Sequence, residues 1–272
     1  MALQKTLSLG KWGNFRNWQI DTLWQDSLTI FWGDWLDLRV RVLQVAASGL
    51  VAPLIYILAF GLGLGSSIRP GIGESYLEFI LPGMVALSSM TISFTGTVFS
   101  ICGDRLYTKT FEEMLLLPIH PLAMHLGKMM AGIVRGLLTS GSVLVVAILF
   151  TGKIWSFLNP LFLGLLVLNC AVFSGLGVIV GLKVQSLETV GLFNNFLIVP
   201  MSFLGGTFFE PADLPSLLQT VVFVLPLTHT SVGMRAAAYE ISQFPWYTIP
   251  MLLLFAIALS FIGAYQFSHQ QD

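Results

Sequence analysis

The chain has 272 residues and a formal net charge of −1; 55% of its residues are hydrophobic and only 10% are charged. Soluble globular domains carry about 25% charged residues, so a chain of this composition must expose much of its surface to lipid. Without a net positive field, it lacks the attraction for phosphate on which nucleic-acid binding depends, and no nucleic-acid partner is expected. The composition predicts an all-α, polytopic membrane protein, because helices satisfy their backbone hydrogen bonds internally in lipid.

The N-terminal part predicts a helix that lies in the plane of the membrane interface. Residues 28–41 read LTIFWGDWLDLRVR, in which Trp32 and Trp35 stand among acidic and basic side chains. Tryptophan favours the headgroup region, and an apolar stripe beside charge is typical of an interfacial amphipathic helix. A frayed cytosolic tail is the alternative. We expect residues 1–41 to form a tail with this helix and residues 42–272 to form the transmembrane domain.

Six segments are long and apolar enough to cross a bilayer, which takes about 20 mostly apolar residues. In chain order they are residues 42–64, 79–101, 129–150, 161–182, 190–209 and 246–267. Between the last two lies DLPSLLQTVVFVLPLTHTSVGMR, residues 213–235. Its apolar piece, residues 214–225, is about half a crossing long and stops at Pro226. This stretch predicts a re-entrant or interfacial hairpin.

The lysines and arginines indicate the orientation of the chain, because these residues are enriched in cytoplasmic loops. With the N-terminus inside, nine of the 13 lie on the cytoplasmic side, and three, Arg69, Lys153 and Arg235, lie outside. Six spans return the C-terminus to the side of the N-terminus. The sequence therefore predicts that both termini are cytoplasmic and that the hairpin is extracytoplasmic.

Charge is concentrated in the predicted cytoplasmic loop, residues 103–129, which contains GDRLYTKTFEEMLLLPIHP. Thr110 and Glu113 have the spacing of a capping box, and Pro118 cannot continue a helix, so a short helix is predicted between them. Its apolar side is expected to consist of Phe111, Met114, Leu115 and Pro118. A helix of this length is marginal in water, so this side must pack on neighbouring span ends or in a groove of a cytosolic partner.

Three stretches of the sequence resemble the ABC-2 type permeases, the membrane subunits of ABC exporters. They are the loop just described, FILPGMVALSSM at residues 79–90, and FLGGTFFEPADLPSLLQTVVFVLPLTHTSVGMR at residues 203–235. In the family, the arginine of the loop is followed by a Gly-Thr-x-Glu stretch and a proline. Here the stretch that follows Arg105 contains KTFE at residues 109–112, so a lysine replaces the glycine. The LPLTH at residues 225–229 looks closest to the nodulation-factor and polysaccharide-export branch, although drug-exporting relatives share much of it.

The resemblance implies that the loop helix is a coupling helix held in a cleft of a separate ATPase subunit. Its coupling residues would be Arg105, Thr110, Phe111, Glu112, Glu113, Met114, Leu115 and Pro118. The resemblance also implies two membrane subunits, as a homodimer surrounded by membrane lipid, and two ATPases in the bacterial inner membrane. The sequence contains no G-x-x-x-x-G-K-[ST] motif. ATP and Mg²⁺ are therefore expected on the partner, whereas this chain is expected to bind no cofactor and to be no enzyme.

Polar residues inside the predicted spans are candidates for a substrate path. They are Ser93, Thr97, Arg135, Asn194, Asn195 and, in the hairpin, His229. A charge within the membrane is a functional candidate by default, but Arg135 could also reach the inner interface or pair with Glu188. The hydroxyl groups could equally bond their own helix backbone, and His229 could form a gate with Arg235 or a structural hydrogen bond.

Two weaker patterns complete the sequence. Gly132 and Gly136 form a G-x-x-x-G motif, which permits two helices in a membrane to approach closely. His120 and His125 flank the loop helix and are predicted to be solvated, so no metal site is expected there.

Together these features favour the permease subunit of an ATP-driven exporter that moves an amphiphile outward, such as a lipid, a lipid-linked saccharide or a drug. The alternative is a secondary transporter driven by an ion gradient. That class needs acidic residues at mid-membrane, and only Glu188, at the edge of a span, comes near. An intramembrane enzyme would need a metal or nucleophile constellation, and the sequence shows none.

Overall fold

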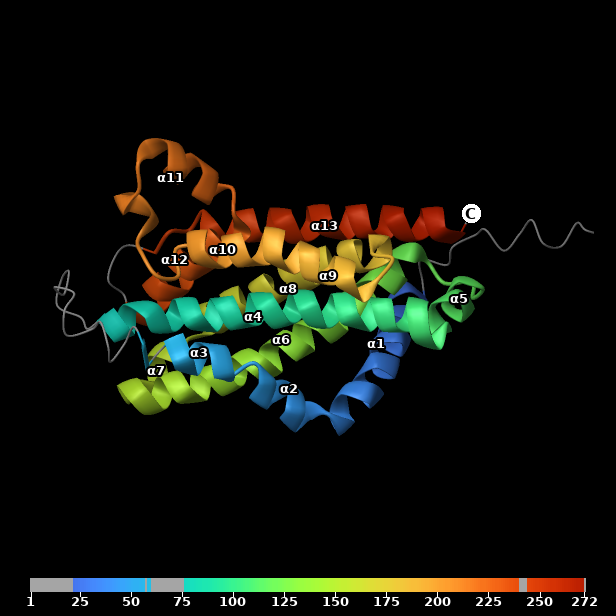
Figure 1. Cartoon of the computed structure of the whole chain (residues 1–272), viewed down its shortest axis with the longest axis horizontal. Helices are drawn as coiled ribbons and strands as arrows, with labels where there is room; N and C mark the ends of the chain where they lie inside the picture. Colours follow the sequence, from blue (N-terminus) through green and yellow to red (C-terminus); the bar gives the residue numbers. More distant parts are fainter. Residues whose placement is uncertain (1–21, 57, 60–75, 240–243, 272) are drawn as a thin grey trace, which may run out of the picture.

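The computed structural model describes residues 22–56, 58, 59, 76–239 and 244–271, and every regular element in these ranges is a helix (Figure 1). By length and composition, five helices can cross a membrane, or up to seven if each of two bent helix pairs is one span. The predicted all-helical, multi-span architecture is therefore confirmed, and the predicted number of six spans lies inside this range.

The helices form an elongated bundle, whose two ends we name the α5 end and the α11 end after the short helices that stand there (Figure 1). The described elements are α1 Leu23–Val40, α2 Val42–Ser48, α3 Val51–Tyr56, α4 Tyr76–Gly103, η4 Asp104–Thr108, α5 Thr110–Leu115, α6 Pro121–Thr151, α7 Ile154–Phe157, α8 Pro160–Lys183, α9 Leu187–Phe193, η5 Asn194–Ile198, α10 Val199–Leu204, η6 Pro211–Asp213, α11 Ser216–Phe223, α12 Pro226–Tyr239 and α13 Thr248–Gln271. The C-terminal end of α13 lies at the α5 end.

The centre of the bundle is the packing of α4 against α8 and α6. Small residues bring these helices together, because a Cβ atom on Gly132 would overlap the Thr97 hydroxyl and one on Gly136 would overlap the Ser93 hydroxyl. On α8, a Cβ atom on Gly177 would lie 2.8 Å from the backbone oxygen of Phe94. The G-x-x-x-G motif of α6 is therefore a site of close helix contact, as predicted.

Asn169 of α8 joins three helices in the interior and was not predicted as an important residue. Its Nδ2 donates to the backbone oxygen of Ala86 at 3.0 Å and to Ser89 Oγ at 2.7 Å, both on α4. Its Oδ1 accepts a hydrogen bond of 2.8 Å from the hydroxyl of Thr230 on α12. An amide that is shielded from water needs such partners inside the protein. The available signal was a lone asparagine in the apolar run LLVLNCAVF.

The third predicted span begins earlier than expected. Helix α6 starts at Pro121, because proline suits the first helical turn and the His120 Nδ1 atom accepts the Leu122 N–H at 3.1 Å. Burial lowers the pKa of His120, which favours the neutral ring that this bond requires. The loop therefore ends at residue 120. The prediction of a solvated His125 was wrong, since this residue lies inside α6 and is fully buried against Gly263 of α13.

Two other predicted spans are only partly as expected. The fifth runs through α9, η5 and α10 and ends at Leu204, because Gly205 ends the helix and Gly206 turns the chain with a φ of +72°. The first is described only as α2, α3 and residues 58 and 59, and the bent pair of Leu23–Val40 and Val42–Tyr56 has an angle of 77°. The remainder of that predicted span, from residue 60, lies outside the described residues.

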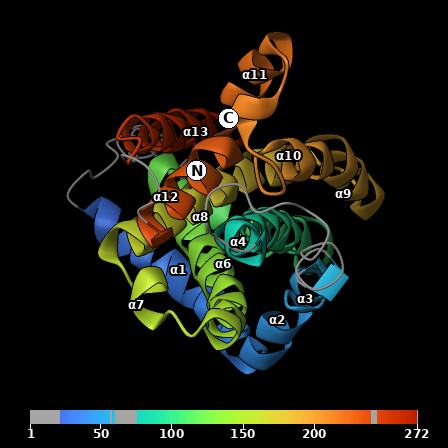
Figure 2. The ribbon, with the colours of Figure 1, turned by 90° about the vertical axis from the view of Figure 1, so that its left-hand side faces the viewer.

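The predicted hairpin is a bent pair of helices. The pair α11 and α12 meets at 92°, and the break falls just before Pro226, where the sequence predicted a stop. Helix α12 is largely buried, whereas α11 stands away from the bundle beside α10 and α13 (Figure 2).

The close contact of α4 with α6 makes a direct test of the packing. We expect Gly136→Ala to lower the free energy of unfolding by about 1–3 kcal/mol, because the new methyl group would displace Ser93 and Cys170. Gly141→Ala on the same helix is the matched control, since nothing lies within 4 Å of its Cβ position. Thermal unfolding in detergent would measure both variants, and an unchanged Gly136→Ala would contradict the packing.

Candidate coupling site

The charged loop is built directly on the end of α4. Its first turn, η4, continues α4 with wider π-helical turns, and Lys109 then adopts a left-handed conformation with a φ of +58°. That residue turns the chain into the short helix α5. Glycine adopts this conformation most easily, and Lys109 stands at the position where the resembling family has glycine.

The predicted helix exists, but the predicted capping box does not. The residue that precedes the helix is Lys109, and no side chain caps α5. Thr110 already belongs to the helix, and its hydroxyl lies 2.9 Å from that of Thr108. The prediction was wrong because the left-handed turn falls at Lys109, one residue before the position that the motif requires, so that Thr110 already lies inside the helix.

The apolar side of α5 packs against the chain itself. Phe111 is only 5% exposed, and its ring centre lies 5.9 Å from that of Phe267 on α13. Met114 and Leu115 belong to the same cluster, together with Ile119. Pro118 is exposed and takes no part, so its assignment to this side was wrong. Of the two alternatives, packing on neighbouring span ends describes this face.

Arg105 holds the root of the loop in place. Its Nη1 donates to the backbone oxygens of Gly181 at 2.9 Å and Val184 at 3.0 Å, at the C-terminal end of α8. Helix C-termini attract cations, because their last carbonyl groups lack helical partners. The guanidinium also lies over the Phe111 ring, 5.7 Å from its centre. Arg105 therefore joins α8 and α5, and its guanidinium is occupied by contacts within the chain.

The other side of the loop faces outward. Its exposed large apolar and acidic residues, which we call the coupling patch, are Leu106, Tyr107, Glu112, Glu113, Leu116 and Leu117; Thr108, Lys109, Thr110 and Pro118 are exposed beside them. Leu116 is 86% exposed and Tyr107 is 68% exposed, so the patch combines large apolar side chains with two carboxylates. Glu112 and Glu113 of this surface are among the predicted coupling residues, whereas its apolar residues Leu106, Tyr107, Leu116 and Leu117 were not predicted.

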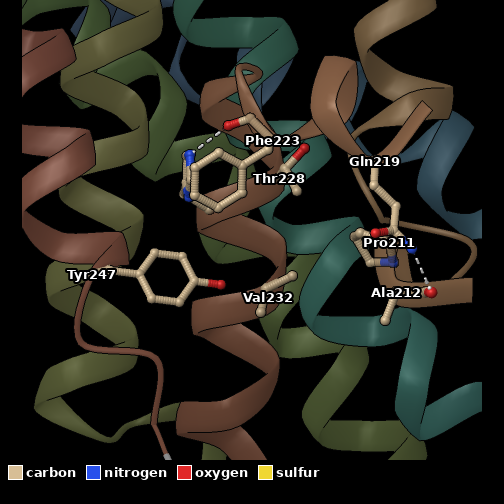
Figure 3. Close-up of a pocket in the computed structure, with 8 residues that line it drawn as sticks. Pro211, Ala212, Gln219, Phe223, Thr228, Val232 and Tyr247 are labelled. Atoms are coloured by element: carbon tan, nitrogen blue, oxygen red, sulfur yellow. Dashed lines mark hydrogen bonds between the residues drawn. The ribbon is translucent and has the colours of Figure 1, made fainter. Parts of the chain in front are cut away.

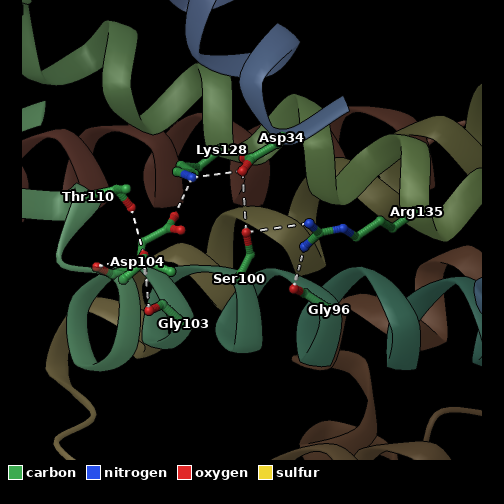
Figure 4. Close-up of polar contacts among 9 residues, drawn as sticks. Asp34, Gly96, Ser100, Gly103, Asp104, Thr110, Lys128 and Arg135 are labelled. Atoms are coloured by element: carbon green, nitrogen blue, oxygen red, sulfur yellow. Dashed lines mark hydrogen bonds and ion pairs between the residues drawn. The ribbon is translucent and has the colours of Figure 1, made fainter. Parts of the chain in front are cut away.

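A buried ion triad fixes the loop to the rest of the bundle (Figure 4). Lys128 of α6 lies 2.9 Å from Asp34 of α1 and 2.6 Å from Asp104, the first residue of η4. Lys128 is 5% exposed, so two carboxylates from distant parts of the chain neutralise a cation that water barely reaches. The triad was not predicted. Asp34 shares one buried face of α1 with Ser27, Ile30 and Leu38, and a carboxylate at this helical spacing was the available signal.

The structure does not bring the candidate path residues together in one cavity. Ser93 and Thr97 are buried in the contact with α6, and the Thr97 hydroxyl bonds the backbone oxygen of Ser93 at 2.7 Å. Asn194 and Asn195 lie on η5 at the edge of the bundle, where Asn195 is exposed. Ser93 and Thr97 are therefore shielded from solvent in this conformation.

Arg135 bonds two neutral oxygen atoms of α4. It donates to the backbone oxygen of Gly96 at 2.6 Å and lies 3.4 Å from the Ser100 hydroxyl (Figure 4). The expected pair with Glu188 is not formed, because Glu188 is exposed at the start of α9. Among the described residues, no carboxylate lies within 4 Å of Arg135.

His229 and Arg235 serve different contacts near the α11 end. His229 Nε2 forms a hydrogen bond of 2.8 Å with the backbone oxygen of Phe223, beside a cavity of about 180 Å³ that Tyr247 also lines (Figure 3). Arg235 donates to the backbone oxygens of Phe79 at 3.1 Å and Gly206 at 2.8 Å. They form no joint gate here, and His229 makes the structural bond that was the alternative.

The left-handed turn at Lys109 generates a stability test. Lys109 is exposed, so its replacement removes no buried contact. We expect Lys109→Gly to be at least as stable as the parent and Lys109→Val to lose about 1 kcal/mol or more, because a β-branched side chain resists this backbone conformation. Thermal unfolding of the two variants would check this, and equal stability of both would argue against the turn.

Comparison with known sequences identifies the family of this chain. The sequence model of the ABC-2 type transporter family matches residues 19–239. The chain is 27% identical to the inner membrane transport permease YadH of Escherichia coli (strain K12) over 232 residues, which cover 83% of this chain and 87% of that protein. It is 31% identical to nodulation protein J of Rhizobium leguminosarum bv. trifolii over 182 residues, which cover 66% of this chain and 69% of that protein. The chain therefore belongs to the ABC-2 type transporter family and is a membrane permease of an ABC transporter.

Proposed function

We propose that this permease exports an amphiphile across a bacterial inner membrane, with the α5 end and both termini in the cytoplasm. The excess of lysine and arginine on that side supports the orientation. The name of the YadH relative, an inner membrane transport permease, supports the location. Outward transport and an amphiphilic cargo, whether lipid, lipid-linked saccharide or drug, follow from the resemblance to exporters and from the mixture of hydroxyl and apolar side chains along α4.

The observation that carries the proposal is the coupling patch. Its large apolar side chains face outward from the charged loop, and α5 presents no other large unburied face. Such side chains in water are typical of protein interfaces, and two carboxylates beside them would suit a basic rim on the partner. The ABC ATPase subunit that this family requires is the proposed occupant. ATP and Mg²⁺ would be held by that subunit.

A second copy of the chain is the other proposed partner. The elements α9, η5 and α10 form the edge of the bundle, and they expose Phe196, Leu192 and Phe203 (Figure 2). An apolar face of this extent needs cover by protein or by lipid. A homodimer in which this edge meets its own copy, with membrane lipid around it, would provide both.

The packing of α4 suggests how movement would open a path. Ser93 and Thr97 are covered by the glycine face of α6, and Thr97 also by Gly177 of α8, so a separation of α4 from these two helices would expose two hydroxyl groups and the Arg135 guanidinium together. The ATPase would supply this separation through α5, which is joined to α8 by Arg105 and to α13 by Phe267. ATP binding and hydrolysis would thus favour different arrangements of the same helices.

An ion-gradient-driven transporter remains less suitable. In the described spans, the acidic residues lie at the ends of helices, at Glu78, Asp104 and Glu188. A carboxylate at mid-membrane would be the expected ion site, and the described part of these helices offers none.

Replacement of one exposed leucine tests the coupling patch. We expect Leu116→Asp to weaken binding of the ABC ATPase subunit by at least about tenfold, because it places a charge in the centre of the proposed apolar contact. Leu217→Asp is the matched control, since Leu217 is 79% exposed but stands on α11 at the opposite end. Co-purification and titration of the detergent-solubilised chain would measure binding. Normal binding by Leu116→Asp, or no ATPase bound by the parent chain, would count against the proposal.

A further inference from the structure

Asp34 of α1 lies between two cations of α6, and only one of them is its partner (Figure 4). Its Oδ1 atom lies 2.9 Å from Lys128 Nζ. Its Oδ2 atom is buried and accepts no hydrogen bond from any described residue. Leaving a buried carboxylate oxygen without a partner is costly, so the present arrangement satisfies only half of this carboxylate.

Arg135 is the second cation, and a single hydroxyl group separates it from Asp34. Ser100 Oγ lies 3.4 Å from Arg135 Nη2 and 3.5 Å from Asp34 Oδ1. Lys128 and Arg135 are seven residues apart, so they lie on one face of α6 at roughly 10 Å along its axis. Arg135 is bonded to neutral oxygens only, which leaves its charge without a direct carboxylate partner in the described structure.

The surface of α6 that faces α1 carries small residues, over which α1 can slide. A Cβ atom on Gly127 would lie 2.7 Å from Ile30 Cβ and 2.8 Å from the backbone oxygen of Ser27, so α1 rests directly on the backbone of α6. The next residue on that face, one turn further, is the buried Ala131. Small side chains interlock weakly, and shifts of one helix past another by up to one turn are a known form of conformational change.

We propose that Asp34 is a positioning residue that exchanges Lys128 for Arg135 when the transporter changes state, as α1 moves about one helical turn along α6. The exchange gives the unpaired Asp34 oxygen a donor and gives Arg135 a carboxylate. It leaves Lys128 paired with Asp104 alone.

The coupling segment can drive this exchange because the triad shares one cation. Asp104 is the first residue of η4, which leads directly into α5. Because Asp104 already lies 2.6 Å from Lys128, a movement of the loop away from α1 would carry the Lys128 ammonium group with it, lengthen the bond to Asp34 and release α1. The inference therefore rests on the proposed function, since it needs an ATPase that moves α5.

The experiment follows the position of α1 directly. Spin labels would be placed at Leu36→Cys on α1, which is 37% exposed, and at Val145→Cys on α6, which is 56% exposed, with Cys102 and Cys170 replaced by alanine. The full chain would be reconstituted with its ATPase in nanodiscs, and pulsed EPR would measure the distance without nucleotide and after trapping with ATP and vanadate. Because α1 would move toward Val145, we expect the distance to shorten by about 5 Å, one helical turn.

Variants of the second cation separate exchange from a merely structural role. Arg135→Gln should leave the nucleotide-free distance unchanged, because Arg135 is no partner of Asp34 in that state, and should abolish the shortening. Arg135→Lys retains the charge and should retain the shortening. Asp37→Asn is the control for removal of a carboxylate from α1 and should retain the shortening. Asp37 is exposed and forms no ion pair among the described residues.

Two results would overturn the exchange: a distance that nucleotide does not change in the parent, or an equal shortening in Arg135→Gln. Both would be measured in a complex that binds its ATPase and hydrolyses ATP. A chain that recovers no ATP hydrolysis in nanodiscs would instead contradict the proposed function and remove the force on which the exchange depends. The unfolding temperature of each variant would show that the helices remain assembled.

Discussion

Lys128 carries its charge where almost no water reaches it, and two carboxylates from different parts of the chain neutralise it. Removal of one partner of a buried ion pair typically costs ~3–5 kcal/mol, because the remaining charge cannot return to water. In this conformation, Asp34 and Asp104 are therefore both held at Lys128. The seat of α1 on α6 and the direction in which the charged loop leaves α4 both depend on this cation.

The same requirement explains two arginines near opposite ends of the bundle. Arg105 donates to the last carbonyl groups of α8, and Arg235 donates to carbonyl groups at the start of α4 and after α10. In both places the backbone supplies the oxygen atoms that lipid cannot. The bonds also join helices that are distant in the chain, so each arginine stabilises one end of the assembly. Cations in and near the spans thus serve as structural ties here.

The described interior is consequently tightly packed and joined by hydrogen bonds between helices. The hydroxyl groups of Ser93 and Thr97 touch the glycine face of α6 and are shielded from solvent in this conformation. Arg105, Phe111 and Asp104 connect the loop to α8, α13 and α6, and the proposed ATPase would act on the bundle through these contacts. In the proposed mechanism, these contacts would convert a movement of the loop into a rearrangement of the helices to which it is joined.

The sequence by itself determined the helical class, the approximate positions of the spans, the break at Pro226 and the short charged helix between the second and third spans. Those features follow from local apolar length, from proline and from the near absence of charge, which act within one turn or one crossing of the chain. Only the tertiary structure decided which side of α5 is free, where Arg105 and Arg135 bond and why Asp34 is buried. The reason is sequence distance: Lys128 meets a carboxylate 94 residues away, and helical periodicity tells which residues share a face but not which helix that face will meet.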